Sequence, residues 1–358
     1  MKNYRLKRGY GVINVALFGL LVAGCSADKD STAAVSEAVA TDTVMDSIVV
    51  YSSRKEHLIQ PVFAQFTEQT GIAVKYTTDK AGVLIERIKT EGQNSPADLL
   101  ITVDAGNLGY AAAEGIFQPM KSAVINQNIA AHLRDDKDLW TGLSLRARTI
   151  VYSTERVRSS DLSTYQAIGQ NQWQGRVCLR TSKKVYNQSL VAMLIAELGE
   201  TKAEQTVASW VANLAIPPTS NDTKVMQAIA AGQCDIGIVN TYYFGRLQAQ
   251  QPDLPLALYW PNQADDDNSG VHVNVSGGGI LKHSKNPDQA RRLLEWLASE
   301  QAQGLFAGLN KEYPVISSVA IDPQVISWGD FKQSSLSLSR AFQLQPAAVK
   351  LMDRVGYQ

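Results

Sequence analysis

Residues 47–76 read SIVVYSSRKEHLIQPVFAQFTEQTGIAVKY, and this stretch decides the fold class. The apolar segment Ser47–Tyr51 predicts a short strand, and the stretch from about Leu58 to Thr70 is helical in pattern. Gly71 is typical of a residue that ends a helix, and Ile72–Tyr76 predicts the next strand. A strand, a helix and a second strand in this order indicate one α/β unit.

The alternation of strands and helices continues along the chain. A helical pattern over Gly82–Glu91 precedes a strand over Asp98–Val103, and Asp104 is placed to cap the next helix. Further on, strands at Val177–Leu179 and Asp235–Val239 enclose helical patterns, and the sequence shows no internal repeat. Strands that alternate with helices are typical of an α/β fold with a largely parallel sheet, which we expect here in two lobes.

Composition and charge exclude several function classes. The 358 residues carry 34 Lys and Arg against 34 Asp and Glu, and 45% are hydrophobic, as in a globular protein of about two domains. Because residues 1–24 hold four basic residues and no acid, the remaining body has 30 basic against 34 acidic residues, a net charge of −4. A globally basic nucleic-acid binder is therefore excluded.

The first 46 residues have the pattern of an export signal followed by a linker. The apolar run Val12–Ala23 follows a basic cluster and is about 12 residues long, too short to cross a bilayer as a helix. The sequence LVAGC at Leu21–Cys25 resembles a bacterial lipobox, which implies that residues 1–24 are removed and that Cys25 is acylated. An ordinary export signal with a fortuitous cysteine is the alternative. Residues 25–46 predict a flexible tether, so we expect a protein held by lipid alone at the periplasmic face of the bacterial envelope.

None of the enzyme motifs that parts of the sequence resemble is complete. His57, His132, His272 and His283 lack the H-E-x-x-H spacing of zinc enzymes, and each is expected to be structural. Gly277–Gly279 lacks the Gly-Lys-Ser/Thr ending of a nucleotide-binding loop and is expected to permit a tight turn or close backbone packing. The sequence therefore predicts a protein that is not an enzyme.

Tyrosine remains as the candidate ligand. Tyr186 follows the strand at Cys178, and Tyr242 and Tyr243 follow the strand that ends at Val239. Ligands of α/β sheets bind outside the carboxyl ends of strands, where these phenols are expected to lie. Phenolate is a hard oxygen donor suited to a hard trivalent cation. Packing of the rings in the core is the alternative, and two adjacent tyrosines reach one site only if the chain leaves extended geometry there.

At these residues the chain resembles the periplasmic ferric-iron-binding proteins of ABC importers, a branch of the type II periplasmic binding-protein family. The resemblance covers the body from Ile48 onward. It runs through the segments Val50–Arg54, Ser95–Leu99, Val103–Gly106, Arg146–Arg148, Tyr186–Ser189, Asn240–Tyr243, His272–Gly277 and Glu312–Val315.

The resemblance implies two lobes, each a mostly parallel sheet flanked by helices, joined by hinge strands. The first lobe is expected at residues 47–147 plus 276–320, and the second at residues 148–275 plus 321–358. Such a protein closes on Fe³⁺ in the cleft between its lobes. As a monomer, it then delivers the ion to the membrane permease of an ABC transporter, which works with an ATPase.

By motif, the resemblance assigns the metal ligands to the three tyrosines. Relatives that add a ligand from the first loop carry His directly after the Arg of the Ser-Ser-Arg stretch, whereas this chain has Lys55 and Glu56 there and His57 comes late. A contribution from Glu56 or His57 is left open. The resemblance suggests that carbonate or bicarbonate fills positions that three phenolates leave free on the ion. Arg54 is the first candidate for its contact and Arg148 the second, because a guanidinium binds two oxygens at once; each is alternatively a packing residue.

Two cysteines also lie at a fixed distance in the sequence from the candidate ligands. Cys178 and Cys234 each lie eight residues before a candidate ligand, Tyr186 or Tyr242, and export places them in an oxidising compartment. If both tyrosines reach one ion from neighbouring strands, the cysteines are expected within bridging distance, about 4.4–6.8 Å between Cα atoms. Two buried free thiols are the alternative.

Two other functions stay open on the sequence. The first is a receptor for a different small anion or organic solute on the same fold, and the second is an exported hydrolase. An organic solute has no need of three convergent phenols, and the chain lacks the paired nucleophile and base of a hydrolase.

Overall fold

One eight-stranded sheet organises the part of the chain that the structure describes. The computed structural model describes residues 47–264 and 270–358; the predicted signal, Cys25 and the tether lie outside these ranges. The strands follow the order β2-β1-β3-β8-β4-β6-β5, and β7 pairs with β4 beside this path. The strands are β1 (Ser47–Ser52), β2 (Ala73–Thr78), β3 (Leu99–Val103), β4 (Thr141–Ser153), β5 (Val177–Cys178), β6 (Ile236–Asn240), β7 (Leu256–Tyr259) and β8 (His272–Ile280).

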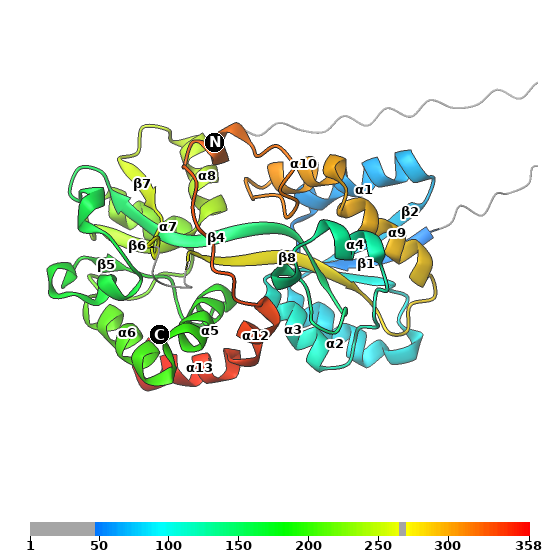
Figure 1. Cartoon of the computed structure of the whole chain (residues 1–358), viewed down its shortest axis with the longest axis horizontal. Coiled ribbons are helices and arrows are strands. Elements are labelled where there is room, and N and C mark those ends of the chain that lie inside the picture. The colour runs from blue at the N-terminus through cyan, green and yellow to red at the C-terminus, as the bar shows by residue number, and fades with distance from the viewer. Residues whose placement is uncertain (1–46, 265–269) are drawn as a thin grey trace, which may run out of the picture. The chain divides into compact units, whose positions relative to one another are not determined.

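Two long strands, β4 and β8, run side by side through the middle of the sheet (Figure 1). Every residue of the two strands except Tyr152 is buried. They pair antiparallel, with Arg148 opposite His272. A Cβ on Gly277 would lie 2.3 Å from the carbonyl oxygen of Thr141, so only glycine allows this approach. The close backbone packing expected of the glycine run is confirmed.

Parallel pairing is confined to the strands on either side of this central pair. β1 is parallel to β2 and β3, and β5 is parallel to β6, as the alternation of strands and helices predicts. β8 is antiparallel to β3, and β4 is antiparallel to β6 and β7. The α/β class is confirmed, but the sheet is mixed, because the two central strands run against their neighbours.

Helices flank the sheet, and several begin and end at predicted residues. Asp104 caps α3 by accepting a hydrogen bond from the backbone N–H of Gly106, and Gly71 ends α1 with a φ of 72°. The helices are α1 (Glu56–Thr70), α2 (Ala81–Glu91), α3 (Ala105–Ala113), α4 (Ala123–Asn128), α5 (Val185–Leu198), α6 (Glu200–Ala212), α7 (Asp222–Ala230), α8 (Thr241–Gln250), α9 (Pro287–Leu297), α10 (Glu300–Gly308), α11 (Pro323–Ile326), α12 (Leu338–Gln343) and α13 (Gln345–Arg354). Within the described ranges, no helix is both long enough and apolar enough to cross a membrane.

Two large hydrophobic cores share the central strands. The first core contains Leu100 and Trp140 and takes up the first half of β4 through Leu145. The second core contains Trp210 and takes up the later part of β4 from Ile150. A smaller cluster around Val151, Met226 and Phe244 uses the opposite face of β4, since neighbouring strand residues point to opposite faces.

The last segment of the chain contacts both large cores. Val325 and Leu338 pack in the first core, and Leu351 packs in the second. The helix α12 fits against α3 at a glycine, because a Cβ on Gly109 would lie 2.3 Å from the Phe342 ring. Residues 321–358, which were expected in the second lobe, thus contribute side chains to both cores, with Leu336 also packing against the second.

A disulfide joins Cys178, the last residue of β5, to Cys234, which precedes β6. Their Cα atoms are 5.9 Å apart, within the range that the sequence argument requires, and both residues are buried. Because β5 and β6 are parallel neighbours, the bridge ties together the two chain segments that lead to Tyr186 and Tyr242.

Removing this disulfide is expected to weaken the fold without abolishing it. A Cys178→Ala/Cys234→Ala variant should lose about 2–4 kcal/mol of unfolding free energy, because the bridge restricts the unfolded chain between residues 178 and 234. Urea denaturation of the variant and of oxidised and reduced wild-type protein measures this loss. Equal midpoints in all three samples would contradict the expectation.

Candidate metal centre

A cavity of about 640 Å³ lies among residues from both ends of the sheet. Its lining comes from the loop after β1, from the starts of α2, α3, α5 and α8, from β4, and from the last two helices. The residues that matter below are Arg54, Lys55, Lys80, Arg146, Lys183, Lys184, Tyr186, Tyr242, Tyr243, Arg246 and Glu312. All three predicted tyrosines therefore line one cavity.

Each tyrosine lies in the first turn of a helix. Tyr186 is the second residue of α5, and Tyr242 and Tyr243 are the second and third residues of α8. The chain leaves extended geometry at the end of β6, as two adjacent ligands require. Successive helix residues are turned by about 100°, so both tyrosines of α8 face the cavity, and their ring centroids are 4.5 Å apart.

Burial keeps two of these phenols protonated in the metal-free protein. Burial raises the pKa of Tyr186 to about 12, and the nearby Tyr243 adds to this rise, while the charge of Arg146 and a hydrogen bond with Tyr242 oppose it. Burial also raises the pKa of Tyr242 well above its usual value, with further rises from Tyr186 and Tyr243. A cation that binds these oxygens must therefore displace protons, which its own charge makes possible.

Arginine side chains surround the phenol rings. The guanidinium carbons of Arg146 and Arg180 lie 5.8 and 5.2 Å from the ring centroid of Tyr186, and that of Arg246 lies 4.8 Å from the centroid of Tyr243. These positive charges favour the ionised phenolates over the neutral phenols. The arrangement thus offsets part of the burial cost when the tyrosines become ligands.

Basic side chains outnumber acidic ones in the lining. Glu312 is the single acidic residue among the described residues that line the cavity, and it is ion-paired to Arg54. The basic residues of the lining are Arg54, Lys55, Lys80, Arg146, Lys183, Lys184 and Arg246. The cavity therefore suits a cargo that brings negative charge with it.

Arg54 lines the cavity, but most of its guanidinium is already bound. Nη1 donates to Glu312 at 3.0 Å and to Ser144 at 3.3 Å, and Nη2 donates to the carbonyl oxygen of Phe306 at 3.3 Å. The group also lies 4.1 Å from the centroid of the Phe306 ring. Nε is buried and is the one guanidinium nitrogen of Arg54 without a hydrogen-bond partner.

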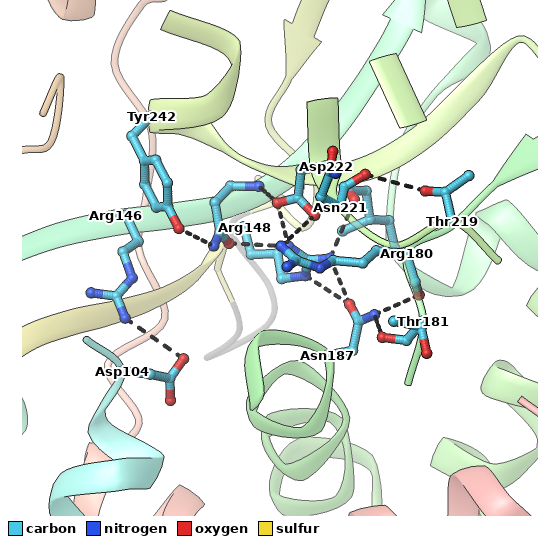
Figure 2. A network of polar contacts seen from close by, with 12 residues as sticks. Asp104, Arg146, Arg148, Arg180, Thr181, Asn187, Thr219, Asn221, Asp222 and Tyr242 are labelled. Carbon is cyan, nitrogen blue, oxygen red and sulfur yellow. Dashed lines mark hydrogen bonds and ion pairs between the residues drawn. The ribbon is translucent and has the colours of Figure 1, made fainter. Parts of the chain in front are cut away.

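Arg148 is placed as a packing residue and does not line the cavity (Figure 2). Its Nε and Nη2 donate to the side-chain oxygen of Asn187 at 3.0 and 2.6 Å. Its Nη1 donates to Asp222 and to Asn240, each at 3.1 Å. Because every nitrogen of the guanidinium has a partner inside the protein, the predicted anion contact of Arg148 does not agree with this structure.

Arg146 is the residue that sequence reasoning missed. It is buried, lines the cavity, and has its Nη2 3.6 Å from a carboxylate oxygen of Asp104, beyond hydrogen-bond distance (Figure 2). Arg146 and Arg148 are two positions apart on one strand, so they share a face and the pattern does not distinguish them. Nη1 of Arg146 donates to the hydroxyl of Ser276 at 3.1 Å, whereas Nη2 is paired with Asp104 by charge and makes no hydrogen bond.

The first loop contributes Ser53, Arg54 and Lys55 to the lining but not Glu56 or His57. Glu56 and His57 are exposed, and Glu56 contacts the hydroxyl of Tyr76 at 3.5 Å. In the described part of the chain, no group of three or more His, Cys, Asp or Glu residues is arranged to hold a metal ion. A metal in this cavity would therefore depend on the phenol oxygens.

A two-core α/β fold with a cavity lined by basic and phenolic side chains beside its central strands is the arrangement expected of a solute-binding protein. The chain belongs to the family of bacterial extracellular solute-binding proteins, whose model matches residues 51–304.

The chain is also similar to three named proteins, two of them known as solved structures. Iron uptake protein A2 of Synechocystis sp. is 42% identical over 318 residues, which cover 87% of this chain and 90% of the relative. A Trichodesmium protein, IdiA (FutA), solved with iron and citrate ligands, is 43% identical with a TM-score of 0.84, over 87% of this chain and 100% of that one. Ferric iron-binding protein A of Mannheimia haemolytica, in an open conformation, is 35% identical with a TM-score of 0.81, over 87% and 99% of the two chains. These likenesses confirm the predicted periplasmic binding-protein fold.

We expect the metal-free protein to lose stability as the pH rises from about 10 toward about 12. An unfolded tyrosine releases its proton near pH 10, whereas the raised pKa of folded Tyr186, about 12, keeps its proton bound. The folded state then holds more protons, so rising pH favours unfolding. Unfolding free energies of wild-type protein and Tyr186→Phe at pH 8 and pH 11 measure this contribution. The variant should lose less stability than wild type, and equal losses would refute the assignment.

Proposed function

We propose that this chain is the receptor of an iron ABC transporter that captures Fe³⁺ through the phenolates of Tyr186, Tyr242 and Tyr243. It delivers the ion to the permease in the inner membrane and its ATPase, and it carries out no chemical reaction itself. One observation carries the proposal: three buried or half-buried tyrosines from two helix starts line one cavity. Relatives named for iron uptake and ferric iron binding support it.

The charge of the ligand set agrees with a trivalent cargo. Three phenolates balance the three charges of Fe³⁺, and hard oxygen donors suit a hard ion. Both tyrosine-bearing segments are helix starts, where the partial positive charge of the backbone favours an anionic side chain. The bound metal therefore stabilises the ionised phenolates, whereas the phenols stay protonated in the metal-free site.

A synergistic anion completes this site. Three phenolates leave positions of an octahedral ion unfilled, and the basic residues of the lining remain uncompensated once the metal is bound. Carbonate or bicarbonate fits this requirement, with Arg146 as the first contact and Nε of Arg54 as the second. The Trichodesmium relative was solved with an anion, citrate, as well as iron.

Two lobes close around the ion in this proposal. The first comprises residues 47–147 plus 276–320 and the second residues 148–275 plus 321–358, with β4 and β8 as the hinge. One contact supports closure across the cavity, because the hydroxyl of Ser189 in α5 donates to Asp104, the cap of α3, at 2.8 Å. The protein works as a monomer in the periplasm, anchored by the lipid on Cys25.

A receptor for an anionic organic solute is the second candidate. The excess of basic residues in a cavity of about 640 Å³ favours it. In this second candidate the tyrosine oxygens bind no metal. Removing those oxygens therefore distinguishes the two candidates, because only the first depends on them to bind Fe³⁺.

The variants Tyr186→Phe, Tyr242→Phe and Tyr243→Phe are each expected to keep the fold and to lose Fe³⁺ affinity by more than about 100-fold. Loss of an outer-shell partner alone costs about 10–100-fold, and these changes remove a ligand atom. Metal analysis and the visible phenolate-to-iron charge-transfer band measure the loss. Tyr51→Phe is the matched control, since Tyr51 is equally buried but bonds to Glu91 outside the cavity. Wild-type affinity in all three variants would exclude the tyrosine site.

Bound iron is expected to leave on mild acidification while the protein stays folded. Protons compete with the metal for phenolate and carbonate oxygens, so affinity falls as the pH falls. Bicarbonate should raise iron retention, and Arg146→Ala should reduce that benefit more than Arg54→Ala. Far-UV dichroism and the charge-transfer band are followed together through an acid titration with and without bicarbonate. Iron loss that occurs only on unfolding would rule out release by protonation of the ligands.

A further inference from the structure

A buried polar network joins the two helices that carry the tyrosines (Figure 2). Asp222, the first residue of α7, is fully buried, and its carboxylate accepts three hydrogen bonds. The donors are Nη1 of Arg148 at 3.1 Å, Nη1 of Arg180 at 3.3 Å and the backbone N–H of Asn240 at 2.9 Å. A single carboxylate therefore holds two arginines and the residue that precedes α8.

The network reaches the start of α5 through Asn187, the residue after Tyr186. The side-chain oxygen of Asn187 accepts two hydrogen bonds from Arg148. Its side-chain nitrogen donates to the carbonyl oxygens of Arg180 and Thr181, at 2.8 and 3.0 Å, in the loop before the helix. Asn187 thus fixes both the first turn of α5 and the loop that leads into it.

The network reaches the start of α8 through Asn240. Nη1 of Arg148 donates to the side-chain oxygen of Asn240, and the side-chain nitrogen of Asn240 donates to the hydroxyl of Tyr242 at 3.3 Å. One guanidinium is therefore bonded to the neighbour of Tyr186 and to the residue that contacts Tyr242. Asn187 lies in α5, whereas Asn240 is the last residue of β6, so Arg148 connects two elements that are far apart in the sequence.

We infer that Asp222 and Arg148 are positioning residues of the iron site. They hold the starts of α5 and α8 at a fixed separation, so that the phenols converge before the metal arrives. The planar guanidinium fixes the direction of each bond, and the carboxylate fixes the guanidinium. Without the pair, only the disulfide and the pairing of β5 with β6 relate the two helix starts, and metal binding must then order their first turns at the expense of affinity. This inference rests on the proposed tyrosine ligands and extends the site to residues that do not touch the ion.

The test compares Asp222→Asn with a matched control, Asp98→Asn. Asparagine keeps the shape and one acceptor oxygen but removes the charge that Arg148 and Arg180 share. Asp98 is 1% exposed and accepts backbone hydrogen bonds from Val49 and Asn286, but it does not line the cavity. The two substitutions therefore remove one buried carboxylate each, near and far from the tyrosines.

Asp222→Asn is expected to lower Fe³⁺ affinity by about 10–100-fold and to change the position or strength of the charge-transfer band. The protein is titrated with ferric nitrilotriacetate at a temperature where dichroism shows every variant to be folded. Asp98→Asn should lower the melting temperature but keep the wild-type band and affinity. An equal affinity loss in Asp98→Asn would reduce the effect to general destabilisation and overturn the inference.

A second variant decides the question if Asp222→Asn does not fold. Asn187→Ala breaks the link from Arg148 to α5, together with the bonds that Asn187 donates to Arg180, Thr181 and Tyr357, and leaves the ion pair of Arg148 with Asp222 in place. It should also weaken Fe³⁺ binding and alter the band. If every folded variant among Asp222→Asn and Asn187→Ala keeps wild-type binding and spectrum, the inference is overturned but the proposed function is not. Retention of iron by the three Tyr→Phe variants would instead overturn the proposed function.

Discussion

The contact between β4 and β8 is the constraint on which the rest of the structure depends. Both strands are buried on both faces, and glycines bring their backbones together where side chains would clash. Each hydrophobic core takes part of β4, so neither core can fold without the strand that serves the other. Two lobes joined in this way share strands of one sheet, besides contacts such as that of Ser189 with Asp104. Relative movement of the lobes in the proposed receptor therefore requires bending and twisting of these strands. Such movement changes the shape of the cavity.

In the proposed site, the cavity disfavours ionisation of Tyr186 and Tyr242 until a cation binds. Buried tyrosines hold their protons, and the arginines around them carry positive charge that finds few acids in the lining. A divalent or monovalent cation would displace these protons less effectively than a trivalent one, because the gain in Coulomb energy scales with the ion's charge. In the proposed site, the electrostatics that keeps the tyrosines protonated without a metal therefore favours a highly charged ion together with an anion.

Local patterns predicted much of the fold, and contacts distant in sequence account for the rest. The strands and helices over residues 47–113 follow from apolar spacing, Gly71 and the cap at Asp104. The antiparallel course of β4 and β8 does not, because an apolar run buried on both faces carries no information about strand direction. The tyrosines were found from their motif, whereas the choice between Arg146 and Arg148 depends on partners such as Asp222 that lie 74 residues away. The pairing of Arg54 with Glu312 spans 258 residues and leaves no local signal.

The contact of α12 with α3 links the cavity to the timing of release. Phe342 lies against Gly109 and also lines the cavity, while the helix that follows packs on α5 of the second core. In the proposed receptor, an opening that separates α3 from α5 disturbs the packing of α12, because α12 contacts both helices. If the cavity holds an ion as proposed, its residence time then depends in part on Phe342, a side chain that provides no ligand atom. Dissociation rate and equilibrium affinity become separately adjustable, so a receptor of this kind could hold its cargo for longer without binding it by different atoms.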